Sequence, residues 1–257
     1  MTKSRTDIIS TLEEAAILYN QPSFIKKDPI SIPHQFTSKE DIEISGFLTS
    51  IISWGRRDNI LKSANKLMSL MDNKPYDFLI NSKEKDLRPF ENFIYRTFQG
   101  VDCIFLVSAL REVYQSGSNL EDLFSKPFQK HQSIKMSISE CRNTLLSYPH
   151  LQRSEKHLAN PLKGSAAKRI NMFLRWMVRK DNNGVDFGIW NKIPTSALIC
   201  PLDVHSGRVA RHLGLLNRKQ NDWKAAAELT TNLKELDIDD PIKYDFALFG
   251  LGVNYSI

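Results

Sequence analysis

Apolar residues recur every three to four positions along most of the chain, which is the spacing of helices that bury one face. This pattern predicts a helix over residues 6–19, a second that Ser38 and Asp41 open and that runs to Ile52, and a third with apolar residues from Ile60 to Met71. Further helices are expected at residues 75–80, 89–97, 101–114, 120–124 and 134–146. Alternating strand patterns are almost absent, so the sequence predicts an all-α protein.

Prolines and glycines mark the interruptions between these helices. Residues 21–36 contain three prolines and mixed charge, which predicts an extended connector. Toward the end of the chain, the run Asn221-Asp222-Trp223 opens a helix. The acids before Pro241 start a last helix, which Gly250 and Gly252 are expected to close.

Residues 160–216 contain two further helix starts. Pro161 and Gly164 mark a turn into an amphipathic helix. Helical periodicity gives this helix an apolar face and a basic face, formed by Ile170, Phe173, Leu174 and Met177 on one side and by Lys168, Arg175 and Arg179 on the other. Asp203 is placed to cap the second helix, because its carboxylate can accept a backbone N–H, and Gly214 is placed to end it.

Positive charge is concentrated around the first of these helix starts. The chain has a net charge of +6. Residues 153–180 alone hold eight Lys or Arg against one acid, a local charge of +7: Arg153, Lys156, Lys163, Lys168, Arg169, Arg175, Arg179 and Lys180. Such a patch is the footprint expected for phosphate binding. The alternative is a solvated helix face, which is the usual outcome of a charge run.

Length and composition narrow the class of protein. The 257 residues are 41% hydrophobic, which fits a globular protein with one sizeable core or two small lobes. No apolar run reaches the length of a membrane span, and the polar opening residues lack a signal core, so we expect no membrane association and a cytoplasmic location. Cys103, Cys141 and Cys200 are too scattered for a metal cluster or a disulfide framework, and the first two are expected in the core.

Two segments carry a family resemblance. The run LKGSAAKRI at residues 162–170 resembles the hairpin of the helix-hairpin-helix (HhH-GPD) DNA glycosylases, which ends in a lysine nucleophile. The run PLDVHSGRVARHL at residues 201–213 resembles the second signature of that superfamily, which contains a catalytic aspartate. Lys163 stands where the family prefers proline, Ala166 replaces the second hairpin glycine, and the 35 positions from Lys168 to Asp203 exceed the interval in endonuclease III. The whole chain is also similar to an uncharacterised bacterial family of unknown function.

The resemblance implies a fold and a partner. We expect residues 1–257 to form a two-lobed helical HhH-GPD glycosylase-like fold, with a helical lobe at 38–147 and a hairpin-bearing lobe at 1–37 plus 148–257. The implied partner is double-stranded DNA, bound by a monomer. Hairpins of this family commonly hold a structural cation through backbone carbonyls. No other cofactor is expected, and the C-terminus lacks the four cysteines of the iron–sulfur cluster found in several endonuclease III relatives.

The resemblance also implies roles for individual residues. Removing a damaged base requires a nucleophile at C1′ of the sugar and a group that stabilises the cationic sugar as the base departs. By correspondence, Lys168 is the nucleophile and Asp203 is the catalytic aspartate, which would stabilise positive charge on the sugar or assist in activating the nucleophile. The DNA-binding set implied around them comprises Lys163, Gly164, Ser165, Ala166, Arg169, His205 and Arg208. His205 is expected to organise the helix start rather than to act as an acid or base.

The turn at residues 53–58 resembles the glycosylase segment that fills the gap left by an extruded base. Trp54 is therefore a candidate stacking residue, and Arg56 and Arg57 are candidates for contacting an orphaned base or a phosphate. The alternatives are a core position for Trp54 and solvated side chains for the arginines. For the aromatic residues of the segment 181–200, packing against the body is favoured over lining a base pocket.

Three functions remain open on the sequence. The leading hypothesis is a DNA repair glycosylase that acts in base excision as a hydrolase, with Schiff-base AP lyase activity. The alternative is a non-catalytic helix-hairpin-helix DNA-binding protein. A third reading is a helical protein interaction module, whose binding would be insensitive to salt.

Overall fold

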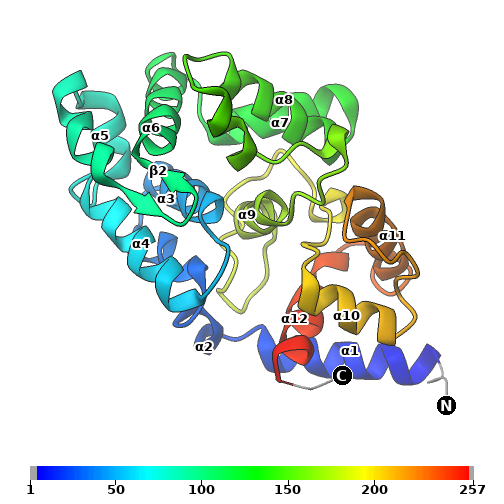
Figure 1. Cartoon of the computed structure of the whole chain (residues 1–257). Helices are drawn as coiled ribbons and strands as arrows, with labels where there is room; N and C mark the ends of the chain where they lie inside the picture. The colour runs from blue at the N-terminus through cyan, green and yellow to red at the C-terminus, as the bar shows by residue number, and fades with distance from the viewer. Residues whose placement is uncertain (1–4, 255–257) are drawn as a thin grey trace. The chain divides into compact units, whose positions relative to one another are not determined.

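The computed structural model, described here for residues 5–254, is built almost entirely of helices and divides into two units (Figure 1). Unit 1 combines residues 1–26 with 161–257, and unit 2 comprises residues 27–160. The sequence analysis expected different limits, with a helical lobe at residues 38–147 and a hairpin-bearing lobe at 1–37 plus 148–257. The all-α class is confirmed for the described residues. None of their helices is long and apolar enough to cross a membrane.

Unit 2 is organised around α3, which is buried on nearly its whole surface from Ile42 to Ile51. Ser38 begins this helix as predicted, since its hydroxyl accepts the backbone N–H of Asp41. The elements of the unit are the 3₁₀ turns Pro29–Ser31 and Pro33–Gln35, α3 (Lys39–Ile51), α4 (Arg57–Ser69), α5 (Pro75–Asn81), the 3₁₀ helix Glu84–Asn92, β1 (Ile94–Tyr95), β2 (Phe98–Gln99), α6 (Gly100–Gln115), α7 (Leu120–His131), α8 (Ile134–Leu146) and the 3₁₀ helix Gln152–His157.

The prediction of a helix over residues 89–97 is wrong. A 3₁₀ helix ends at Asn92, and an antiparallel hairpin follows in which Ile94 pairs with Gln99 and Tyr95 with Phe98. The physical reason is a local period of two, because Phe93 and Tyr95 are buried while Ile94 between them is 69% exposed.

The connector predicted at residues 21–36 is not extended. Its three prolines each begin a short helical turn, α2 (Pro22–Ile25) in unit 1 and the two 3₁₀ turns that open unit 2. Proline favours the first position of a turn because its fixed φ suits the helix and its missing N–H is not needed there. Ile30 and Ile32 are fully buried, so the segment contributes to the core of unit 2.

Unit 1 contains the hairpin segment and both helix starts that the sequence singled out. Its elements are α1 (Arg5–Tyr19), α2, the 3₁₀ turn Pro161–Lys163, α9 (Lys168–Val178), the 3₁₀ turn Thr195–Ala197, α10 (Val204–His212), α11 (Trp223–Lys234), the 3₁₀ turn Pro241–Lys243 and α12 (Tyr244–Asn254). Helix α12 contacts both α1 and α10. Trp190 is buried, with its ring 5.3 Å from that of Phe173, so the packing role favoured for this part of the 181–200 segment is confirmed.

Gly250 and Gly252 do not close the last helix but lie inside α12, which runs to Asn254. Both are positions of close approach. A Cβ on Gly250 would lie 2.1 Å from the Tyr19 ring, and one on Gly252 would lie 3.0 Å from His205. The glycines therefore allow α12 to pack tightly against α1 and α10.

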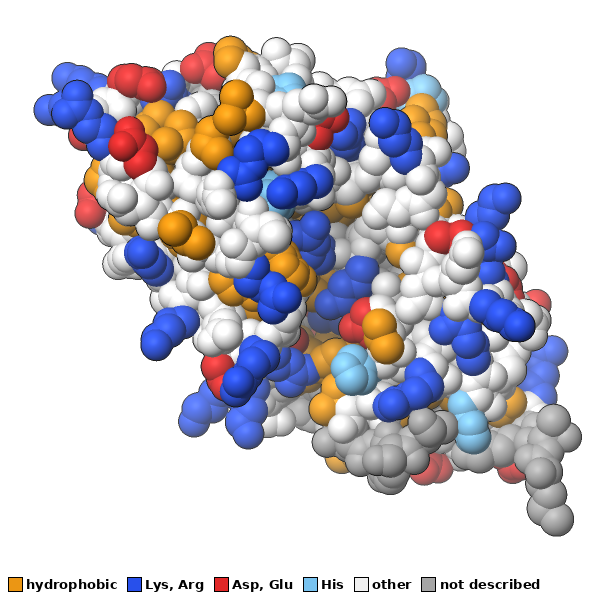
Figure 2. Space-filling view, viewed as in Figure 1, with side chains coloured by type: hydrophobic (Ala, Val, Ile, Leu, Met, Phe, Trp, Pro, Cys, Tyr) orange, Lys and Arg blue, Asp and Glu red, His pale blue; other side chains and the backbone are white. Residues whose placement is uncertain are grey.

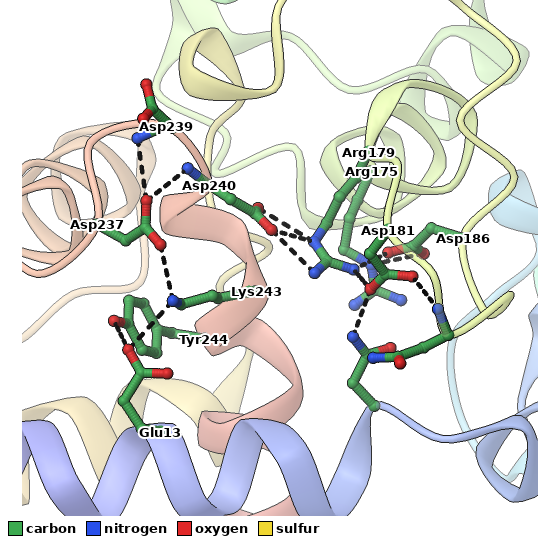
Figure 3. A network of polar contacts seen from close by, with 12 residues as sticks. Glu13, Arg175, Arg179, Asp181, Asp186, Asp237, Asp239, Asp240, Lys243 and Tyr244 are labelled. Carbon is green, nitrogen blue, oxygen red and sulfur yellow. Dashed lines mark hydrogen bonds and ion pairs between the residues drawn. The ribbon is translucent and has the colours of Figure 1, made fainter.

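Two of the three residues on the expected basic face of α9 are internal rather than solvated. Arg175 and Arg179 are 4% and 2% exposed. Figure 3 shows their guanidinium groups directed at carboxylates from the loop after α9, Asp181 and Asp186, and at Asp240, which precedes the 3₁₀ turn Pro241–Lys243. Arg175 Nε lies 3.1 Å from Asp186 Oδ1, and Arg179 Nη1 lies 3.1 Å from Asp186 Oδ2. These two arginines are therefore neutralised inside unit 1 and do not contribute to an external basic patch.

Further ion pairs complete this network. Arg175 also pairs with Asp245, and Arg179 pairs with Asp181 and Asp240. Burial disfavours the charge of Arg179, but Asp186 and Asp240 outweigh burial and raise its pKa. Burial raises the pKa of Asp186, although both arginines oppose that shift.

The network predicts the effect of removing Asp186, whose side chain is fully buried between the two arginines. Asp186→Ala leaves both guanidinium groups buried with fewer counter-charges, and we expect the free energy of unfolding to fall by about 3–5 kcal/mol. Urea denaturation measures this change. The control is Glu235→Ala, which removes an exposed ion pair with Arg5 and should change stability by less than about 0.5 kcal/mol. Similar small losses in both variants would contradict this interpretation.

Candidate functional site

The hairpin segment of unit 1 is a turn that two left-handed residues shape. Gly164 has φ of 91° and Ala167 has φ of 49°. Gly164 N donates to Pro161 O at 3.0 Å, and Ala167 N donates to Ser165 Oγ at 3.2 Å. The left-handed non-glycine position is thus Ala167, directly before Lys168, and not Ala166, where the family glycine is replaced. A left-handed alanine costs on the order of 1 kcal/mol, so the surrounding contacts must hold this turn.

A short segment before α11 supplies those contacts. Ser165 and Asp222 form an isolated antiparallel bridge, and Trp223 N donates to Gly164 O at 3.0 Å. The adjacent Asn221 donates from Nδ2 to Asp203 O at 2.9 Å. Residues 221–223 therefore tie the hairpin to the start of α10. The sequence identified this run as a helix start but contained no signal of the tie, because Ser165 and Asp222 pair through their backbones across 57 positions and the Asn221 side chain binds a backbone carbonyl.

The two oxygens of Asp203 have different partners. Oδ1 accepts the backbone N–H groups of His205 at 2.8 Å and Ser206 at 2.9 Å, which confirms Asp203 as the cap of α10. Oδ2 lies 3.9 Å from Nζ of Lys168. The cap fixes the carboxylate, and its second oxygen is left directed at the amine.

Lys168 and Asp203 form a partly exposed pair. Their side chains are 30% and 24% exposed, which leaves both accessible to a ligand. Lys168 Nζ also lies 3.6 Å from Sδ of Met172, one turn along α9. An amine and a carboxylate at this separation, on two helix starts, can act on one small group such as a sugar ring.

Asp245 is a third ionisable group at this site, and sequence reasoning missed it. It lies in the first turn of α12, is 6% exposed and contacts Arg175. Burial raises its pKa to about 6, while the charges of Arg175 and Lys168 oppose the shift and that of Asp203 adds to it. Asp245 is thus close enough to the Lys168–Asp203 pair to respond to both charges.

The other residues proposed for DNA contact in unit 1 surround this pair. Lys163, Gly164 and Ser165 are exposed, and Ala166 and Arg169 are partly buried. Burial lowers the pKa of Arg169 to about 10. His205 and Arg208 are exposed on α10, and Arg208 Nη2 donates to Gly252 O at 2.8 Å. Figure 2 shows Lys and Arg side chains spread over the viewed face of unit 1 around α10.

The remaining predicted residues belong to unit 2. Trp54 is half-buried, so the core position considered for it applies only in part. Arg56 is exposed before α4, and Arg57 is half-buried at its first position. Arg153 and Lys156 of the basic run also lie in unit 2, so the run of eight cations is divided between the units.

The residues of the hairpin fit a structural cation poorly. Carbonyl oxygens of Pro161, Gly164 and Ala166 already accept hydrogen bonds from protein donors. A cation would have to share these oxygens, so we derive no step through one. Among residues 5–254 there is no cluster of three His, Cys, Asp or Glu side chains suited to a metal ion.

Unit 1 thus combines helices with a short turn, a capped helix start at Asp203 and a paired amine and carboxylate. Comparison with known proteins adds the family. The chain belongs to the family described as "Protein of unknown function (DUF2400)", whose model matches residues 28–254. No curated protein and no solved structure matches the chain.

The raised pKa of Asp245 predicts a pH dependence of stability. Asp245 keeps its carboxyl proton in the folded protein up to about pH 6, whereas the ordinary pKa of an aspartate is 3.8. The folded state therefore binds more protons between these values, and ionisation of Asp245 destabilises the fold as pH rises through them. In Asp245→Asn this loss is absent.

The unfolding free energy of the wild type, minus that of Asp245→Asn, should fall by on the order of 2 kcal/mol between about pH 4 and about pH 7. Urea denaturation of both proteins at the two pH values measures it. A difference that does not change with pH would contradict the shifted pKa.

Proposed function

We propose that this protein is a DNA repair glycosylase of the helix-hairpin-helix class, with Schiff-base AP lyase activity on double-stranded DNA. The observation that carries the proposal is the 3.9 Å approach of Lys168 Nζ to Asp203 Oδ2. These are the residues that correspond to the nucleophile and the catalytic aspartate of that class. The turn before α9 and the cap of α10 support the same fold assignment.

The proposed reaction uses both groups on one nucleotide. The neutral amine of Lys168 attacks C1′, and the glycosidic C–N bond breaks, with its electron pair and a proton leaving on the base. Opening of the sugar ring transfers a proton to O4′ and gives an imine between C1′ and Nζ. Loss of a proton from C2′ then expels the 3′ phosphate. Asp203 stabilises the positive charge on the sugar as the base departs.

The hairpin supplies the contact that positions the nucleotide in this proposal. Lys163, Gly164 and Ser165 are exposed beside the start of α9, where backbone N–H groups and the helix dipole favour an anion. A phosphate held there would lie next to Lys168. The cost of the left-handed Ala167 is consistent with strain kept at a functional turn.

A non-catalytic DNA-binding protein is the second candidate, and the hairpin favours it independently of the chemistry. The turn is held by residues 221–223 and Ser165 without any contribution from the Lys168 amine. The hairpin would therefore bind DNA equally well in a protein that has lost its activity.

Borohydride trapping separates the two candidates. Wild-type protein incubated with duplexes that carry different lesions should give a covalent adduct on at least one of them, because borohydride reduces the imine. Lys168→Gln should give none while weakening DNA binding by less than about tenfold, since one charge contact is removed. Asp203→Asn should slow adduct formation by about 100-fold or more.

The matched control for trapping is Lys234→Gln, which removes a lysine from the last turn of α11 and should leave the adduct unchanged. If wild-type protein binds duplex DNA yet forms no adduct on any lesion, the glycosylase and lyase mechanism fails. The non-catalytic DNA-binding function would then be favoured.

The salt dependence of binding tests the partner. The logarithm of the binding constant for duplex DNA should fall linearly with the logarithm of the salt concentration. The slope should be about −0.9 per phosphate contact, because counterions are released. Lys163→Ala should reduce this slope by about 1. Affinity that does not change with salt would exclude phosphate-driven binding and would favour a protein interaction module.

A further inference from the structure

An arginine at the tip of the β1–β2 hairpin of unit 2 occupies a backbone conformation that its side chain does not favour. Arg96 has φ of 53°, in the left-handed region, at the first position of the two-residue turn between Tyr95 and Phe98. Glycine or asparagine ordinarily fills such a position. Arg96 is exposed, so burial does not explain the choice of residue.

The hairpin tip is built against the turn that carries Trp54. A Cβ added to Gly55 would lie 2.7 Å from Arg96 Nη1, and Gly55 itself has φ of 97°. The Arg96 guanidinium therefore lies against the backbone of Gly55, and a side chain at position 55 would have to displace it. The Tyr95 hydroxyl donates to Trp54 O, and the Tyr95 and Trp54 rings meet edge to face at 5.1 Å.

A buried acid anchors the other side of this arrangement. Asp102 is 1% exposed and accepts Gln99 N at 2.8 Å and Ser154 Oγ at 2.7 Å. Arg153 Nη2 lies 3.3 Å from Asp102 and donates to Thr97 O at 3.1 Å, which holds the second residue of the hairpin turn. His157 stacks on Trp54 with ring centroids 6.0 Å apart.

The result is a rigid surface that displays cations beside an indole. Arg153 is committed to Asp102, whereas Arg56 and Arg96 form no ion pair with any residue in the range 5–254. An unpaired guanidinium held in place next to an aromatic ring suits a ligand with both anionic and planar groups. Nucleic acid offers both phosphates and bases, while an acidic peptide offers only the charges.

We propose that Arg96, seated on Gly55 beside Trp54, is a DNA-phosphate contact of unit 2. The proposal rests on the proposed function for the identity of the partner and extends it by naming a contact in the second unit. It also explains why an arginine occupies a left-handed turn position. The side chain is retained for binding at a cost in backbone conformation.

The test compares Arg96→Gly with wild-type protein by fluorescence anisotropy on a labelled DNA duplex. Glycine relieves the left-handed backbone, so the Tm should be equal to or above that of the wild type. DNA affinity should nevertheless fall about three- to tenfold, and the logarithmic salt slope should decrease by about 0.9. Gly55→Ala should weaken binding in the same direction, because it displaces the guanidinium of Arg96.

Arg88→Ala is the matched control, since it removes an exposed arginine from the 3₁₀ helix Glu84–Asn92 of the same unit. It should leave affinity within about twofold of wild type. The proposal is overturned if Arg96→Gly binds DNA as tightly as wild type, or if Arg88→Ala weakens binding equally. It is also overturned if polyglutamate competes as well as DNA and with the same dependence on Arg96.

The outcome is distinguishable from failure of the glycosylase proposal. Arg96-dependent DNA binding without any borohydride adduct would support this contact and remove the enzyme activity. Adduct formation through Lys168, with unchanged DNA affinity in Arg96→Gly, would support the enzyme activity and remove the Arg96 contact.

Discussion

The buried charges of Arg175 and Arg179 fix the helix from which the candidate amine projects. A guanidinium group keeps its charge when buried, so it requires carboxylates at defined positions. Asp186 bridges the two arginines from the loop after α9 (Figure 3). Asp245 meets Arg175 from the start of α12. Because these bonds are directional, they constrain the rotation of α9 and its position along its axis. Lys168 is the first residue of α9, so its side chain is directed at the group beyond the N-terminal end of that helix.

What lies there is a carboxylate that is itself fixed by a helix cap. One oxygen of Asp203 accepts two backbone N–H groups of α10, and the other faces Lys168. Residues 221–223 connect the two helix starts by pairing with the hairpin and bonding to the carbonyl of Asp203. The pair is therefore held by bonds at both ends rather than by its own attraction, which at 3.9 Å and partial exposure contributes little. Preorganisation of this kind is what an enzyme site requires.

The parts of this arrangement that the sequence predicted are local ones. Ser38 and Asp203 were predictable as caps, because a cap depends on a side chain and the N–H groups two or three residues later. The internal position of Arg175 was not predictable. Periodicity shows which residues share one face of a helix, but it does not show that a distant loop covers that face. The 94–99 hairpin was missed because two-residue strands are too short to show alternation clearly. The role of residues 221–223 rests on backbone pairing with the hairpin and on a bond from the Asn221 side chain to a distant backbone carbonyl, and neither partner can be read from the sequence.

The central claim is that the Lys168 amine and the Asp203 carboxylate act on the same sugar. Peptide mapping of a borohydride-reduced protein–DNA adduct by mass spectrometry tests it most directly. The account predicts that the sugar remnant is attached to the peptide containing Lys168, and that no other lysine carries it. Attachment to another lysine or to the N-terminal amine would contradict the account, because the amine that reacts would then not be the one that faces Asp203.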